Sequence, residues 1–217
     1  MRTFLSIGAG PGMGFETAER FAREGFDIVL GARNEGTLKE LSDRLRAKGH
    51  KANVRAVDAG EARNVTRLIA DVERDFGRID VLHYNAASMR NATIADQPAD
   101  TFNSDLAVNI GGAQTAIQAA LPGMIDRGSG SVLLTGGGFA LQPHPDYLSL
   151  SVGKAGIRAL AQGLFESLKQ KGIHIATVTV AGFVEPNSKD ATAVAEEFWR
   201  LYSQPKDAWA VETTYTP

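Results

Sequence analysis

Two hydrophobic patterns alternate along this chain and constrain its fold more than any other feature. Short apolar runs typical of buried strands are followed by segments whose apolar residues recur every three or four positions, as on one helix face. The expected strands lie near residues 4–7, 26–30, 53–57, 79–82, 131–135, 173–180 and 208–214, and the expected helices near 15–22, 38–45, 65–76, 100–126, 150–170 and 191–203. This order predicts an α/β fold in three layers, with helices on both faces of a doubly wound, mostly parallel sheet of about seven strands.

Composition excludes several other kinds of protein. The 217 residues are 43% hydrophobic and 22% charged, which suits one globular domain over residues 1–217, and no apolar run approaches the ~18 residues that a membrane span requires. The net charge of −2 argues against nucleic-acid or anionic-membrane partners. The chain has no cysteine, so disulfides and thiolate metal sites are excluded, and we expect no bound metal. The first apolar run is too short for a secretory signal, so we expect a cytoplasmic location.

A glycine-rich loop joins the first expected strand to the first expected helix. Glycines at this place permit a tight turn and a close backbone approach to a pyrophosphate, and the N–H groups of the helix N-terminus point at the anion. A plain tight turn is the alternative, but a strand before the loop and a helix after it are the context of a dinucleotide site. The sequence therefore predicts a Rossmann-type, dinucleotide-binding domain. Its predicted loop contacts are Gly8, Gly10, Gly12, Met13 and Gly14.

The end of the second expected strand indicates which dinucleotide is bound. An acidic residue about 20 residues after the loop would hold the ribose 2′-hydroxyl group of NAD. Asp27 comes too early for that role, and the strand instead ends in Ala32-Arg33-Asn34. A guanidinium offers a planar pair of donors that suits a 2′-phosphate. Arg33 therefore favours NADP, with NAD as the alternative cofactor and a solvated loop cation as the alternative role of Arg33.

From the glycine loop to about Pro186 the sequence resembles the short-chain dehydrogenase/reductase family. Gly8, Gly12 and Gly14 match the Gly-x-x-x-Gly-x-Gly of that family, and Ala181 departs from its Pro-Gly motif. The resemblance implies further cofactor contacts at Asp58, Asn85, Ala86 and Gly182, with Asp58 touching the adenine. It also matches Asn109 and Lys154 to the asparagine and lysine of the catalytic tetrad, and it implies that Lys154 holds the nicotinamide ribose.

The same resemblance shows that two catalytic groups of the family are missing. The proton-donating tyrosine of the family lies four residues before its lysine, where this chain has Leu150. The serine that orients the carbonyl corresponds to Gly137. A hydride transfer to a carbonyl needs a general acid, which usually contributes about 10²–10⁴-fold to the rate. The chain is therefore expected to be a divergent member whose proton donor is not the standard one.

Tyr147 is the first candidate to replace the missing tyrosine. It lies seven residues before Lys154, which on a continuous helix would place it two turns, about 10 Å, away. Pro143 and Pro145 predict that the helix begins only after Tyr147, so that a loop could fold this side chain inward; a packed loop aromatic is the alternative. The other candidates are Tyr84, His144 and, as a group that orients an oxygen, Thr135.

Three functions remain open at this point. The first is an oxidoreductase that prefers NADP and acts on an unknown small carbonyl or alcohol, with Lys154, Asn109 and Tyr147 as its catalytic residues. The second is a catalytically silent dinucleotide-binding sensor or regulatory protein, in which Asn109 only supports the backbone of its own helix. The third is a scaffold that has lost the cofactor as well.

The helix expected over residues 150–170 carries apolar and small residues around much of its circumference. Such a helix is buried on two sides, by its own domain or by another subunit. The resembled family assembles through this helix and the one bearing Asn109, so we expect a homodimer or homotetramer.

Overall fold

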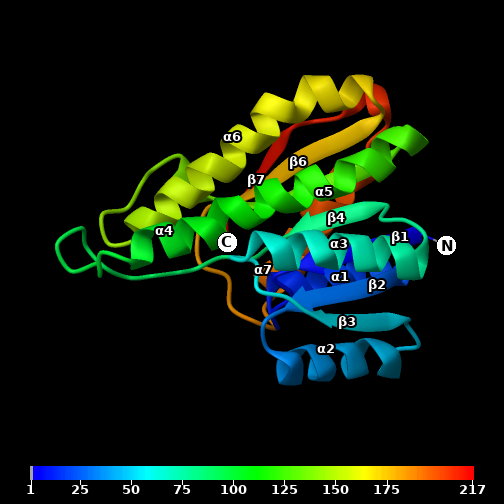
Figure 1. Cartoon of the computed structure of the whole chain (residues 1–217), viewed down its shortest axis with the longest axis horizontal. Coiled ribbons are helices and arrows are strands. Elements are labelled where there is room, and N and C mark those ends of the chain that lie inside the picture. The colour runs from blue at the N-terminus through cyan, green and yellow to red at the C-terminus, as the bar shows by residue number, and fades with distance from the viewer. Residues whose placement is uncertain (1) are drawn as a thin grey trace.

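Seven parallel strands form one sheet between two layers of helices in the computed structural model, which describes residues 2–217 (Figure 1). The strand order is β3-β2-β1-β4-β5-β6-β7, and every neighbouring pair is parallel. The strands are β1 (Arg2–Ile7), β2 (Phe26–Ala32), β3 (Ala52–Ala56), β4 (Val81–Tyr84), β5 (Gly130–Gly137), β6 (Ile173–Val180) and β7 (Glu212–Tyr215). The expected doubly wound α/β fold is confirmed.

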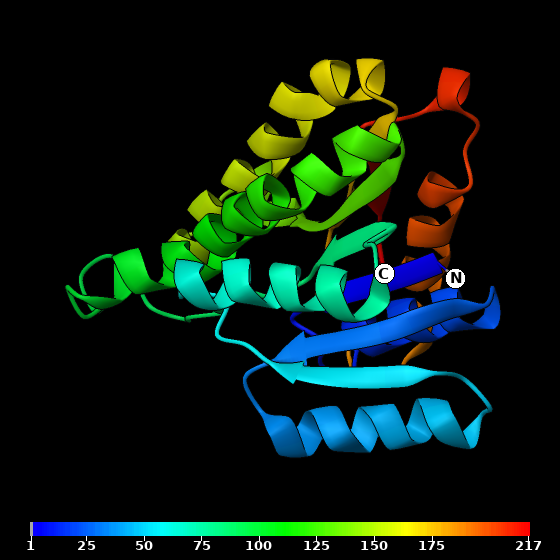
Figure 2. The ribbon, with the colours of Figure 1, turned by 45° about the vertical axis from the view of Figure 1, so that its right-hand side comes forward.

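Adjacent residues of the strands serve opposite faces of the sheet, because side chains alternate along a strand. Leu5 belongs to the core under one set of helices, while Phe4 belongs to the core under the other set. The first set is α3 (Ala62–Phe76), α5 (Gly112–Arg127) and α6 (Leu148–Gln170), and the second is α1 (Met13–Arg23), α2 (Glu35–Ala47) and α7 (Lys189–Tyr202). Figure 2 shows α7, in orange, on the other side of the sheet from α5, in green.

The long helix expected over residues 100–126 is divided into three parts. A short helix α4 (Thr101–Leu106) leads into a π-helical turn (Ala107–Gly111), and α5 follows. A π turn holds one extra residue per turn and is frequent at functional sites. The periodicity of apolar residues does not reveal one extra residue, so the sequence predicts a single helix here.

Two strand boundaries also differ from the sequence prediction. The fourth strand begins and ends two residues later than expected, at 81–84. The last strand is confined to 212–215, because a 3₁₀ turn (Lys206–Ala208) takes up the start of the segment expected to be extended.

Helix α6 is buried on one side only within the single chain. Leu150, Ile157 and Ala161 lie in the core, whereas Val152 and Ala159 on the outer side are exposed. Among residues 2–217, no helix is long and apolar enough to cross a membrane.

Candidate functional site

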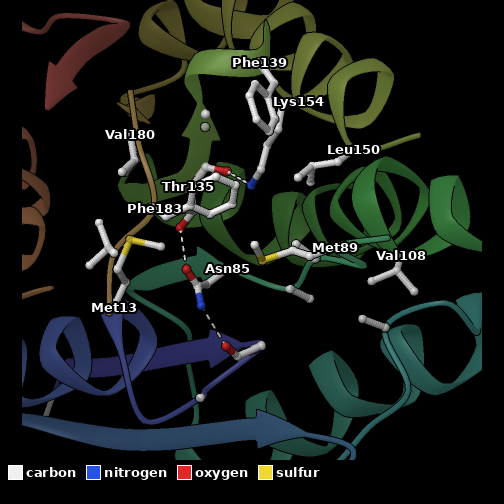
Figure 3. A pocket seen from close by; sticks show the side chains of 18 of the residues that line it. Met13, Asn85, Met89, Val108, Thr135, Phe139, Leu150, Lys154, Val180 and Phe183 are labelled. Atoms are coloured by element: carbon white, nitrogen blue, oxygen red, sulfur yellow. Dashed lines mark hydrogen bonds between the residues drawn. The ribbon is translucent and has the colours of Figure 1, made fainter. Parts of the chain in front are cut away.

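A cavity of about 1030 Å³ opens at the carboxyl ends of the central strands (Figure 3). The chain runs from β1 to β2 on one side and reaches β4 on the other, and ligands of open α/β sheets bind where the strand order reverses in this way. The predicted cofactor-binding residues that line the cavity are Gly8, Gly10, Met13, Arg33, Asp58, Asn85, Ala86, Lys154 and Gly182. The structure thus brings together residues that span most of the chain.

The glycine loop forms the floor of this cavity. Gly8 has a φ of +89°, and a Cβ at this position would lie 2.2 Å from the backbone nitrogen of Ala86, so only glycine fits. Gly14 packs behind it, where a Cβ would lie 3.0 Å from the carbonyl oxygen of Gly8. Gly12 is the N-cap of α1, and no side chain of residues 2–217 caps this helix, which leaves N–H groups of the first turn for an anion. The loop fits a pyrophosphate.

A chain of hydrogen bonds fastens this loop to the middle of the sheet (Figure 3). The Asn85 side-chain amide donates to the carbonyl oxygen of Gly8 at 2.9 Å, and the Thr135 hydroxyl donates to Oδ1 of Asn85 at 2.9 Å. Nζ of Lys154 donates to the carbonyl oxygen of Thr135 at 2.7 Å. The Thr135 hydroxyl, a candidate to orient a substrate oxygen, therefore holds Asn85 instead.

Arg33 lies exposed at the end of β2 and lines the other end of the cavity. Its guanidinium makes no hydrogen bond or ion pair to any residue of the described range 2–217. Asp58 follows β3, and its Oδ1 accepts from the backbone N–H of Gly60 at 2.9 Å, which fixes the carboxylate. Asp27 is the second residue of β2, at the opposite end of the strand. A free guanidinium at this end suits a phosphate group.

Leu150 and Gly137 both line the cavity, at the positions where the resemblance places a tyrosine and a serine. Leu150 lies one helical turn before Lys154 on α6 and is 5% exposed. A Cβ at Gly137 would lie 3.2 Å from Cγ of Lys154, so the stem of Lys154 occupies the space next to Gly137. No tyrosine or serine is among the described residues that line this cavity.

Lys154 is the cation at this end of the cavity. It is half-buried, and burial lowers the pKa of its ammonium to about 8. A charged group loses hydration when it is buried, so its charged form is disfavoured. At neutral pH Lys154 is still mostly an ammonium, but it releases its proton far more readily than an exposed lysine.

Asn109 lies buried in the π turn and holds the loop that follows β4. Its Oδ1 accepts from the backbone N–H of Ser88 at 2.6 Å, and its Nδ2 donates to the carbonyl oxygen of Ser88 at 3.1 Å. A Cβ at Gly153 would lie 2.4 Å from Cβ of Asn109, so α6 passes close to this side chain. The expectation that Asn109 supports its own helix is wrong, because its side chain supports a different segment.

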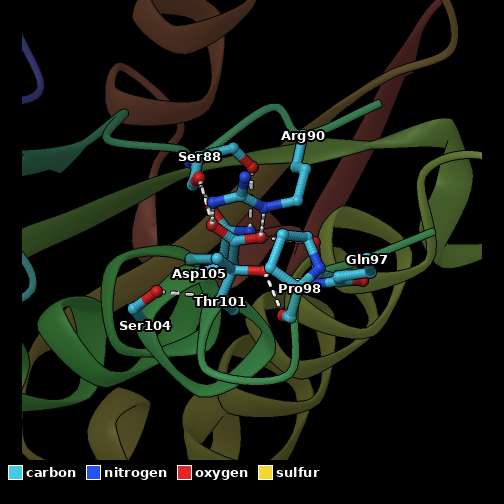
Figure 4. Close-up of polar contacts among 9 residues, drawn as sticks. Ser88, Arg90, Gln97, Pro98, Thr101, Ser104 and Asp105 are labelled. Carbon is cyan, nitrogen blue, oxygen red and sulfur yellow. Dashed lines mark hydrogen bonds and ion pairs between the residues drawn. The ribbon is translucent and has the colours of Figure 1, made fainter. Parts of the chain in front are cut away.

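Asp105 of α4 fastens the same loop (Figure 4). Its buried carboxylate accepts from the Ser88 hydroxyl at 2.5 Å, from Nε of Arg90 at 2.8 Å and from the Ser149 hydroxyl of α6 at 2.9 Å. Burial raises the pKa of the Asp105 carboxyl, and the three partners lower it to a net value below the ordinary one. The guanidinium of Arg90 is therefore paired with the carboxylate of Asp105.

Tyr147 lies directly before α6, as the two prolines predicted, and its ring belongs to an aromatic cluster. The ring stacks on Phe139 at 5.5 Å, and the rings of His144 and Phe183 lie 5.6 and 5.8 Å from it. Phe139, His144 and Phe183 line the cavity, whereas Tyr147 is not among the lining residues. Its hydroxyl makes no hydrogen bond to a described residue.

The other two candidate donors differ in their access to the cavity. Tyr84 is buried, its hydroxyl donates to the carbonyl oxygen of Val108 at 2.5 Å, and burial raises its pKa. The prediction of Tyr84 as a donor is therefore wrong. His144 does line the cavity, and its Nδ1 accepts from the backbone N–H of Asp146 at 3.2 Å, which leaves the ring proton of neutral His144 on Nε2.

Sequence reasoning missed the apolar side chains of the cavity. Met89, Phe139, Leu141 and Phe183 line it from the loops after β4, β5 and β6. Their only signal in the sequence is that they follow predicted strands, because the carboxyl ends of parallel strands share one edge of the sheet.

Comparison with known proteins places this chain in a family. Residues 2–196 match the family described as short chain dehydrogenase. An uncharacterized oxidoreductase of Staphylococcus saprophyticus is 28% identical over 184 residues, which cover 84% of this chain and 79% of the relative. An uncharacterized oxidoreductase of Staphylococcus aureus is 26% identical over 220 residues, covering 97% of this chain and 94% of the relative.

Solved structures share the whole fold. A short-chain dehydrogenase from Rhodopseudomonas palustris superposes with a TM-score of 0.91 at 28% identity, covering 100% of this chain and 98% of the other. A metagenomic short-chain oxidoreductase in complex with NADP superposes with a TM-score of 0.92 at 21% identity, covering 100% and 97%. The glycine loop, the parallel sheet and the matched residues 2–196 lead to one conclusion: this chain belongs to the short-chain dehydrogenase family.

Proposed function

We propose that this protein is an oxidoreductase that uses a nicotinamide dinucleotide, prefers NADP, and acts on a small carbonyl or alcohol. The observation that carries the proposal is the guanidinium of Arg33, which has no partner among residues 2–217 and lines the same cavity as Lys154. Support comes from family membership and from the metagenomic relative in complex with NADP.

Each part of the cofactor has a matching group in the cavity. The loop from Gly8 to Gly14 and the start of α1 would hold the pyrophosphate, and Arg33 would hold the 2′-phosphate. Asp58 would contact the adenine, and Gly182 would be a further contact of the cofactor. The nicotinamide, when bound, supplies or accepts a hydride; the protein provides the position, the charge and the proton.

The proton must come from a group other than the usual tyrosine. Lys154 is the first source, because its Nζ lies in the cavity and its pKa is lowered to about 8. Asn109 acts as a positioning residue through the Ser88 backbone. Tyr147 serves as a donor only if its ring leaves Phe139 and turns into the cavity, and a Tyr147→Phe variant with full activity would exclude it.

A catalytically silent dinucleotide-binding sensor is the second candidate function, favoured by Leu150 and Gly137 alone. If the protein is an oxidoreductase, it should oxidise NADPH in the presence of at least one member of a panel of carbonyl and enone compounds. If it is a sensor, it should bind the cofactor and oxidise none. Turnover that is lost in Lys154→Met, with NADPH binding retained, would exclude the sensor.

Calorimetric titration of the purified protein with NADPH and NADH tests the cofactor proposal. We expect micromolar binding of NADPH and weaker binding of NADH, with the difference lost in Arg33→Ala. Arg63→Ala is the matched control, because Arg63 is an exposed arginine of α3 outside the cavity. Equal affinity of the wild type for both cofactors would contradict the NADP preference. If neither NADPH nor NADH binds, the scaffold is the function that remains.

We also propose that the exposed side of α6 joins copies of this chain into a homodimer or homotetramer. Val152, an apolar residue on this side, is 43% exposed. Sedimentation velocity should give an oligomer for the wild type and a smaller species for Val152→Glu, and a monomeric wild type would contradict the proposal.

A further inference from the structure

We infer that the substrate end of the cavity takes an uncharged, planar, conjugated dicarbonyl compound of the quinone type, whose two-electron reduction leaves a delocalised anion. This inference rests on the proposed function and names its substrate class. Three observations carry it: the apolar walls, the aromatic cluster and the missing proton donor.

The walls at the Lys154 end are apolar and come from three separate loops. Met89 follows β4, Leu141 follows β5 and Phe183 follows β6, and these side chains are 59%, 51% and 57% exposed. Figure 3 shows Met89, Phe183 and Lys154 around the same cavity. Large apolar side chains that remain exposed around one cavity mark a site for an apolar ligand.

An aromatic cluster makes the site suitable for a flat ring. The rings of Phe139 and Phe183 lie 6.1 Å apart in an edge-to-face arrangement, and the imidazole of His144 lies 5.6 Å from Phe139. Aromatic rings prefer edge-to-face or offset stacked contacts with other rings. A planar conjugated ligand can make both kinds of contact here.

The charges at this end do not suit an acidic substrate. Carboxylates and phosphates are bound best by the planar fork of an arginine. Arg90, the arginine of the loop after β4, is held by Asp105 and is not among the lining residues. Arg33 follows β2, on the side of the cavity that we propose for the adenosine. Of the described lining residues, Lys154 is then the one lysine or arginine left at the substrate end.

Without the usual proton donor, the substrates reduced efficiently should be those whose reduced product is a weak base. Hydride addition to an isolated ketone leaves an alkoxide about as basic as hydroxide, whose conjugate acid has a pKa of about 15.7. Reduction of a quinone leaves a phenolate, whose conjugate acid resembles tyrosine with a pKa of about 10. A phenolate needs little help from an acid in the transition state. The presence of Leu150 and Gly137 in place of a tyrosine and a serine should therefore lower the rate of quinone reduction far less than the rate of ketone reduction.

The reaction balances with the groups present. The hydride, supplied by NADPH as it is oxidised to NADP⁺, brings two electrons and forms an O–H bond at one carbonyl oxygen. The ring electrons rearrange, and the second oxygen carries the negative charge. The ammonium of Lys154 donates one proton to that oxygen and is reprotonated from water. The product is the hydroquinone.

A matched pair of substrates tests the inference. 1,4-Naphthoquinone and α-tetralone are both uncharged bicyclic carbonyl compounds of similar size, and the chain has no cysteine for the quinone to alkylate. NADPH oxidation is followed under anaerobic conditions, and the rate measured without the protein is subtracted. We expect kcat/KM for the quinone to exceed that for the ketone by 100-fold or more, in line with the contribution of a general acid. Equal values would overturn the inference.

Restoring a phenol separates the role of the missing donor from the intrinsic reactivity of quinones. In Leu150→Tyr, the ratio of the tetralone kcat/KM to the naphthoquinone kcat/KM should rise at least tenfold. An unchanged ratio in a folded variant that still binds NADPH would refute the link between the missing donor and the substrate class.

Binding without turnover gives an independent readout. Calorimetric titration of 1,4-naphthoquinone into protein saturated with NADP⁺ should show binding that weakens about tenfold in Phe183→Ala, whose exposed side chain can be removed without opening the core. Ile125→Ala is the control, because Ile125 is an exposed residue of α5 outside the cavity and 38% exposed. Equal binding by Phe183→Ala and the wild type would contradict the inferred walls.

The outcomes distinguish the inference from the proposed function. If NADPH binds and α-tetralone is reduced while 1,4-naphthoquinone is not, the substrate class is wrong and the oxidoreductase stands. If NADPH does not bind, the proposed function itself fails.

Discussion

Replacement of Gly8 by alanine tests how the glycine loop is positioned. Gly8 has a φ of +89°, and a Cβ there would lie 2.2 Å from the nitrogen and 2.4 Å from Cα of Ala86. These are backbone atoms of the loop that directly follows β4, so this loop and the glycine loop must move apart. Gly25 offers a matched control, because its φ is +81° but, apart from its chain neighbours, no atom of the described residues lies within 4 Å of a Cβ there.

The two variants differ by the clash alone. A left-handed backbone costs an L-residue about 1–2 kcal/mol, which applies to both alanines. Forcing an extra methyl group into a closely packed region costs about 1–3 kcal/mol more, which applies only to Gly8→Ala. We therefore expect Gly8→Ala to lower the free energy of unfolding by about 2–5 kcal/mol, and Gly25→Ala by about 1–2 kcal/mol.

Urea denaturation measures this difference. At a slope of ~3 kcal/mol per molar urea, the midpoint of Gly8→Ala should lie about 0.3–1 M below that of Gly25→Ala. NADPH affinity should fall in Gly8→Ala and stay at the wild-type value in Gly25→Ala, which lies outside the cavity. Equal midpoints for the two variants would refute the close approach of Gly8 to Ala86 and the account of the loop built on it.

Three further predictions concern buried polar groups. Tyr84→Phe should lower the free energy of unfolding by about 1–3 kcal/mol in urea, because the carbonyl oxygen of Val108 loses its donor; an unchanged midpoint would contradict that hydrogen bond. The Lys154 ammonium has a pKa of about 8 in the folded protein and about 10.4 in the unfolded chain. Between these pH values the unfolded chain binds more protons than the folded protein, so the free energy of unfolding contributed by this group rises with pH. Urea midpoints at pH 7.5 and 10.5 should show this rise in the wild type but not in Lys154→Met. The carboxyl of Asp105 has a lowered pKa, so its contribution to stability is present above the unfolded pKa and is lost as pH falls through the folded one. An acid titration followed by circular dichroism should find Asp105→Asn less stable at pH 7, with the gap closing at low pH, and a gap independent of pH would contradict this assignment.

Local sequence patterns were enough to predict the fold class, and they also predicted that the glycine loop and Arg33 lie at one cavity. The alternation of strand and helix periods fixes a parallel sheet, since consecutive parallel strands need helical crossovers. The loop Gly8–Gly14 and Arg33 are local signals, because each stands directly after a strand whose end must lie at the ligand-binding edge. That edge is where the cavity lies.

The surroundings of Leu150 and Asn109 depend on how distant segments pack together. The π turn adds one residue without breaking the apolar pattern, and it directs Asn109 to the backbone of Ser88, 21 residues earlier in the chain. Tyr84 carries the same hydroxyl as a catalytic tyrosine, yet packing buries it against Val108, whereas His144 reaches the cavity. Met89, Leu141 and Phe183 come from three loops that follow predicted strands, and this position places the loops at one edge but does not indicate which of their side chains line the cavity. Contacts between distant segments depend on how helices pack on the sheet, and spacing along the chain does not carry that information.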